Sequence, residues 1–262
     1  YMTDAAVGGH TITVIPGASS SNAFQVKLDG ATTAVKGEFV AGDYPYIKFT
    51  VDTATYILAH NTTAENVLVL TQLTAEQASA LSLSISGVKL LKEDGTQYAS
   101  GALKAVVTVD AAGTVSISYT YGDNPAPTSV EVITITDASL NIKSVVKVVI
   151  EGKTTYLILH GNWKSVMTAD QYALVGSWTL ADGKTITIGL DPRSAYVCLM
   201  VTYDGNQVIS SYDAYQSNPH MSGTVLFKTV DGKTVCEFTI DGTTYQASLV
   251  DGTMTVTAVT AD

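Results

Sequence analysis

Apolar and polar residues alternate along most of this chain, in segments of five to nine residues that end at Gly, Asp or Asn. This alternation is typical of strands with one covered face. The last third is clearest, because Asp-Gly pairs separate Thr234–Ile240, Thr243–Val250 and Thr253–Val259. Asp-Gly is favoured in tight hairpin turns, where both central residues adopt positive φ. The pattern predicts an antiparallel meander without parallel crossovers, since no helical segment of 10–15 residues separates the strands.

Two short helices interrupt the strand pattern. Thr74 is followed three residues later by Gln77, and Thr168 by Gln171. In such a capping box the Thr hydroxyl accepts from the third backbone N–H, while the Gln amide reaches back to the first. Each pair therefore predicts the start of a helix.

The same two regions indicate an internal repeat. The segment at 55–60 resembles the one at 155–160, and a capping box follows each in the same order. The repeat predicts an all-β chain of two tandem, mostly antiparallel units, 1–140 and 141–262, each with one short helix. The pattern leaves open whether they are β-sandwiches or small barrels. The Pro-containing segment 122–127 is either a linker or a loop within the first unit.

Residues 1–23 are predicted to form an extended N-terminal arm. The segment His10–Ile15 has a strand pattern but lies between Gly-rich stretches. An isolated strand is not stable in water, so this one must pair with its own domain or with a neighbouring molecule. A strand given to a neighbour's open sheet edge is a known mode of association. The candidate assembly strand consists of Thr11, Ile12, Thr13, Val14 and Ile15.

Charge and composition exclude several classes of function. The net charge is -10, charged residues make up 15% of the chain, and Arg193 is the only arginine. No basic patch for nucleic acid or anionic lipid is expected. No segment approaches the roughly 18 apolar residues of a membrane span. The Thr-, Ser- and Gly-rich composition is typical of exported bacterial surface proteins, so we expect a secreted or cell-surface protein whose leader has been removed.

Motifs for catalysis are absent from the sequence. There is no GxGxxG, P-loop, GxSxG or HExxH pattern, so we predict no enzyme, no cofactor and no metal site. His60 and His160 repeat at strand ends and are interpreted as scaffold positions, with a ligand pocket as the alternative. Cys198 and Cys236 lie in predicted strands and are interpreted as buried thiols, with a disulfide as the alternative.

The segment 203–220 is the most site-like part of the sequence. It concentrates Tyr212, Tyr215, Asn218 and His220, and Trp163 precedes the second helix. Aromatic rings beside amides suit sugar binding, because the rings stack on C–H faces while the polar groups bind hydroxyls. These five residues are the candidate glycan site. A subunit contact and a plain covering loop are the alternatives.

Residues 174–178, with Gly176 and Trp178, follow the second helix and precede about seven predicted strands. This arrangement resembles the opening of lipocalin-like small barrels of bacterial surface lipoproteins. The resemblance covers 168–262 and implies a barrel able to enclose a small apolar ligand, with Trp178 at its base. The first copy of the repeat has Leu81-Ser82-Leu83 instead, without a Trp.

The function favoured by the sequence is a non-enzymatic, pilus-like filament or surface subunit that contacts other copies of itself or other surface proteins. Donation of the N-terminal strand is the favoured form of contact. A surface glycan-binding protein and a lipocalin-like ligand-binding barrel are the alternatives from other classes.

Overall fold

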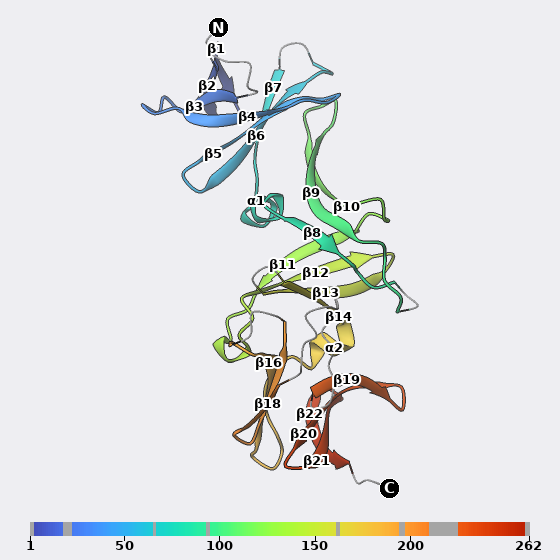
Figure 1. Ribbon diagram of the computed structural model, residues 1–262. Helices are drawn as coiled ribbons and strands as arrows, with labels where there is room; N and C mark the ends of the chain where they lie inside the picture. The colour runs from blue at the N-terminus through green and yellow to red at the C-terminus, as the bar shows by residue number, and fades with distance from the viewer. Residues whose placement is uncertain are drawn as a thin grey trace. The chain divides into compact units, whose positions relative to one another are not determined.

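A computed structural model of the chain describes residues 3–17, 23–64, 67–92, 95–160, 163–193, 197–209 and 225–259 (Figure 1). Of the described residues, 61% are in strands and 7% are helical. Every pairing between the described strands joins sequence neighbours and is antiparallel. The all-β prediction, with antiparallel units and two short helices, is confirmed.

The chain divides into two compact units. Unit 1 comprises residues 1–86 and 102–122, and unit 2 comprises 87–101 and 123–262. The change of unit therefore falls within the Pro-containing segment, whereas the predicted boundary is at residue 140. Residues near 140 instead form a short 3-10 turn, η1 (Ala138–Leu140), that packs on a strand of unit 2. Residues 87–101 also belong to unit 2. The strands before and after them nevertheless pair with each other in one sheet.

Unit 1 is built on a seven-stranded meander in the order β1 to β7, drawn from blue to cyan in Figure 1. Its edge strands β1 and β7 approach each other, so the sheet is nearly closed. Buried side chains from alternate positions, including Ile12, Val26 and Phe49, fill its interior. Its strands are β1 (Thr3–Val7), β2 (His10–Pro16), β3 (Ala23–Leu28), β4 (Val35–Val40), β5 (Tyr46–Val51), β6 (Ala54–Asn61) and β7 (Val67–Gln72). Helix α1 (Ala75–Leu81) and a three-stranded sheet of β8 (Ser84–Val88), β9 (Gly101–Val109) and β10 (Val115–Tyr121) follow.

Unit 2 contains three four-stranded sheets that share one core. The first sheet contributes Val145 and Ile158 to this core, the second contributes Ile188, and the third contributes Phe238. The first sheet consists of β11 (Ser129–Thr134), β12 (Ser144–Ile150), β13 (Lys153–His160) and β14 (Trp163–Thr168), and helix α2 (Ala169–Ala173) follows it. The second consists of β15 (Gly176–Thr179), β16 (Thr185–Leu190), β17 (Leu199–Tyr203) and β18 (Asn206–Ile209). The third consists of β19 (Val225–Val230), β20 (Lys233–Ile240), β21 (Thr243–Val250) and β22 (Thr253–Val259).

Local sequence signals explain the turns and the helix starts. Both predicted capping boxes are confirmed, since the Thr74 and Thr168 hydroxyls accept from the third backbone N–H and both Gln side chains bind back. Five of the described Asp-Gly turns have positive φ at both residues, at Asp29, Asp204, Asp231, Asp241, Asp251 and the glycines that follow them. Asp182 is the exception, because only Gly183 has positive φ and the Asp182 carboxylate accepts from the Lys184 N–H instead.

Candidate functional site

The residues of the predicted glycan site are mostly outside the described part of the chain. Tyr212, Tyr215, Asn218 and His220 fall in the segment 210–224, which lies outside it. Trp163 begins β14 opposite His160, and its side chain is also outside the description. The glycan-binding interpretation therefore stays a prediction.

The predicted assembly strand lies inside the seven-stranded sheet. Residues Thr11–Ile15 belong to β2, which pairs with β1 on one side and with β3 on the other. The ring Nδ1 of His10 lies 2.7 Å from a carboxylate oxygen of Asp29, and the Thr11 N–H donates to the other oxygen at 2.9 Å. Both hydrogen-bonding edges of β2 are occupied within the chain. Donation to a neighbour would require β2 to leave both partners.

Strand β22 is a sheet edge whose outer side has no partner among the described strands. This strand is the last of its sheet and pairs only with β21, over Thr253–Val259. Met254 is buried and Val256 packs against the core, so alternate residues anchor the strand. Thr257 and Val259 are exposed on the other face. The strand carries no charge and no proline, which are the usual protections of an edge against pairing with another chain.

Hydroxyl pairs hold the outer face of this third sheet in register. The side chains of Ser248 and Thr255 are 3.1 Å apart across β21 and β22, and those of Thr239 and Thr244 are 3.2 Å apart across β20 and β21. Cross-strand pairs of this kind stabilise a sheet by a few tenths of a kcal/mol or more each, roughly. The Ser248–Thr255 pair joins β22 to β21, and the backbone pairing of these two strands is regular over Thr253–Val259.

The other sheet edges of unit 2 differ from β22. Strands β18 and β19 each lie against a strand of the neighbouring sheet. Strand β11 carries Glu131, whose carboxylate lies 3.6 Å from the ammonium of Lys147. Strand β14 carries Lys164 and borders a cleft of about 400 Å³. Strand β15 is also an uncharged edge, but it lies against η1, where the side-chain hydroxyls of Ser177 and Ser139 are 2.9 Å apart. Among the described edge strands of unit 2, β22 therefore combines an uncharged sequence with an outer side that has no such contact.

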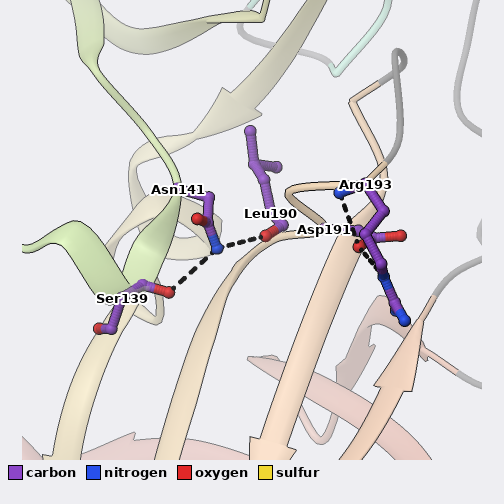
Figure 2. Close-up of polar contacts among 5 residues, drawn as sticks. All are labelled: Ser139, Asn141, Leu190, Asp191 and Arg193. Carbon is purple, nitrogen blue, oxygen red and sulfur yellow. Dashed lines mark hydrogen bonds and ion pairs between the residues drawn. The ribbon is translucent and has the colours of Figure 1, made fainter.

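A close contact between η1 and β16 fixes the second sheet against the first (Figure 2). Asn141 has a left-handed backbone, and its side-chain amide donates to the carbonyls of Ser139 at 3.3 Å and Leu190 at 3.1 Å. A Cβ on Gly189 would lie 2.6 Å from the Leu140 carbonyl oxygen, so only glycine allows this approach. The third sheet packs on the same core as β16, so its position within unit 2 also depends on this backbone contact.

Arg193, the single arginine, is tied to its own loop (Figure 2). Its backbone N–H and its Nε–H both donate to one carboxylate oxygen of the buried Asp191, at 3.1 and 2.9 Å. The Asp191 N–H in turn donates to the Cys198 carbonyl at 3.0 Å. This arrangement closes the turn after β16 and satisfies a buried carboxylate, as buried charges require.

Both cysteines and His60 lie in the described part of the chain. Cys198 and Cys236 are both buried and are not joined by a disulfide, as the buried-thiol interpretation predicts. Burial raises the pKa of the Cys236 thiol to about 12. His60 is exposed near the end of β6. The described residues contain no group of three or more His, Cys, Asp or Glu that could hold a metal ion.

The lipocalin-like resemblance can be placed on this fold. Helix α2 leads into β15, where Trp178 packs against the core of unit 2 and its indole N–H is buried without a partner. Eight strands follow in sequential order, but as two four-stranded sheets. Comparison with protein-family models, curated proteins and solved structures finds no match to the chain. No helix in the described residues is long and apolar enough to cross a membrane.

The β22 edge and the β14 cleft are the features that the sequence interpretation missed. The signal for β22 was present, since it is an uncharged strand next to an Asp-Gly turn, but its edge position depends on the tertiary fold. The cleft has no local signal, because Lys89 and Lys164 are far apart in sequence.

Proposed function

We propose that this chain is a non-enzymatic structural subunit of a bacterial cell surface or surface filament, and that it acts through contacts with other copies of itself. The observation that supports this proposal is the uncharged, open edge of β22, seated on the core through Met254. An open edge presents a row of unpaired backbone donors and acceptors, which a strand of another copy can satisfy.

Pairing at β22 requires less rearrangement than donation of the N-terminal strand. Strand β2 would have to break the pairing with β1 and β3 along its length before it could join a neighbour. The β22 edge would break no strand pairing, because none of the described strands pairs with its outer side. Backbone hydrogen bonds formed by two such edges would extend the third sheet across the contact.

Sedimentation velocity over a range of protein concentrations tests the proposal. We expect the wild-type chain to associate as concentration rises and Thr257→Lys to remain monomeric, because a lysine on the edge strand opposes pairing. Thr229→Lys is the matched control: it adds the same charge to an exposed position of β19, at the other edge of the same sheet. A wild-type chain that stays monomeric, or equal loss of association in both variants, would refute the proposal.

A deletion separates the two forms of contact. Removing residues 1–20 takes away β2 but also uncovers β7, so the informative quantity is the part of the association that Thr257→Lys suppresses. If β2 is the donated strand, Thr257→Lys does not change the association of the deleted chain. If β22 is the contact, Thr257→Lys reduces it as in the full chain.

A further inference from the structure

A cleft of about 400 Å³ lies within unit 2, beside strand β14. One wall is the connection after β8, with Gly87, Lys89 and Gln97. The other wall is β14 with the start of α2. Its volume is within the range of specific ligand sites, roughly 300–1,000 Å³.

The cleft runs along the backbone edge of β14. Five consecutive residues, Lys164–Thr168, line it. Successive side chains of a strand point to opposite faces, so a cleft over one face would be lined by alternate residues only. A cleft lined by every residue therefore extends beside the strand, and Leu157 of the neighbouring strand β13, which also lines it, shows that it reaches over the face of the sheet as well. Since β14 is the last strand of its sheet, this side is the one without a strand partner.

The opposite wall is fastened in place. The Tyr98 hydroxyl donates to the carboxylate of Glu151, and the Lys153 ammonium donates to the Lys92 carbonyl at 2.7 Å. Within the wall, the Tyr98 N–H donates to the Leu90 carbonyl at 2.9 Å. Leu90 and Tyr98 are buried. The wall is therefore held at a fixed position, which lowers the cost of ordering a ligand.

The cleft is positively charged along its described lining. Lys89 and Lys164 contribute ammonium groups, and none of the described lining residues is acidic. The Lys164 ammonium extends toward the opposite wall, since it lies 3.8 Å from where a Cβ of Gly87 would be. Ser165, Thr168 and Gln171 add polar side chains. Such a lining complements a carboxylate.

We propose that this cleft binds an extended peptide with acidic side chains, which pairs with β14 as a fifth strand of the β11–β14 sheet. Five residues of edge give a strand of roughly 16 Å, at about 3.3 Å per residue. Backbone hydrogen bonds to β14 supply affinity, and Lys164 and Lys89 select acidic side chains. The inference concerns a different edge from β22 and holds whether or not the chain assembles with itself.

Peptide selection on the full chain tests this inference. Random heptapeptides displayed on phage are selected on the purified protein, and the most enriched peptide is labelled with fluorescein for anisotropy. We expect enrichment of Asp and Glu among β-branched residues. Lys164→Glu should weaken binding at least tenfold and Lys164→Gln less. Lys104→Glu, which makes the same charge change at an exposed position of β9, should leave binding within twofold.

Backbone pairing is tested with the same peptide. N-methylation at alternate peptide nitrogens should abolish binding for one of the two alternating sets, because only one set faces β14. Amide hydrogen exchange within 164–168 should slow on binding. No enrichment, or binding unchanged by Lys164→Glu, would overturn the inference. Binding that N-methylation leaves unchanged and citrate displaces would replace the peptide with a small anion. A thermal unfolding curve for each variant shows that the fold is intact.

Discussion

Strands β7 and β22 are alike in sequence and differ in their surroundings. Both are six or seven residues long, uncharged and rich in Val, Leu or Thr, and both end a meander. In unit 1, β1 lies beside β7, and Gly8 in the turn after β1 lies near the Leu70 carbonyl. Gly113, in the β9–β10 turn, lies against Val69. In unit 2, β22 has a paired neighbour on one side only.

The comparison indicates that an uncharged edge is available for pairing with another chain only where no other strand lies beside it. A nearly closed sheet can leave its last strand without charge, because the first strand of the same sheet occupies the space beside it. An open four-stranded sheet has no such cover. The comparison can therefore be tested in two ways: by removing the strand beside β7, or by substituting a residue in β22.

Deletion of β1, which lies beside β7, should have the largest effect on association. Deleting residues 1–9 removes β1 and leaves β7 and one edge of β2 exposed. We expect new association that Thr257→Lys does not suppress, measured by sedimentation velocity of the deletion with and without that substitution. If the deleted chain associates no more than the full chain, the cover supplied by β1 is irrelevant and the comparison fails.

Disruption of the contact between η1 and β16 should have the second largest effect. Gly189→Ala places a Cβ against the Leu140 backbone, which cannot move aside as a side chain can. We expect a loss of about 2–3 kcal/mol in the free energy of unfolding of unit 2. Trp163 and Trp178 both belong to unit 2, so tryptophan fluorescence in urea reports it. Gly42→Ala, where a Cβ meets nothing within 4 Å, is the control. Equal effects of the two substitutions would contradict the packing argument.

Removal of the helix caps should have a smaller effect, and it allows the stabilities of the two units to be compared. Thr168→Ala and Thr74→Ala each remove the hydroxyl that accepts the third backbone N–H. We expect each to cost about 1 kcal/mol in its own unit. Thr168→Ala should shift the tryptophan transition, and Thr74→Ala should shift only the circular dichroism signal. A tryptophan transition that both variants shift equally would mean that the units unfold together.

The smallest expected effect is the pH dependence of the β2–β3 contact. Hydrogen bonds from the His10 ring and the Thr11 N–H hold the pKa of Asp29 below its usual value of 3.8. The contribution is complete above that value and is lost as pH falls through the lowered pKa. In the Asp29→Asn variant, the free energy of unfolding of unit 1 should therefore decrease less steeply as pH falls from about 5 to about 2. Circular dichroism melting curves measure this, with Asp43→Asn as control. An unchanged slope would show that the contact does not form.

Local signals explain why much of the fold follows from the sequence. The capping boxes and most Asp-Gly turns depend on residues within four positions of each other, and the alternation of Met254 and Val256 with threonines depends on one strand. The connection 87–101, the cover of β7 and the cleft beside Lys164 depend on contacts between distant segments. A pattern in one segment carries no information about these, so the interaction edges could not be placed from sequence.

Amide hydrogen exchange of β7 and β22 at low and high protein concentration tests whether β22 is the assembly edge. If it is, exchange in Thr253–Val259 slows as concentration rises, because intermolecular hydrogen bonds protect these amides. Exchange in Val67–Gln72 should not change with concentration. Association that leaves β22 exchange unchanged, or that protects β7 instead, would contradict the assignment of β22 as the assembly edge.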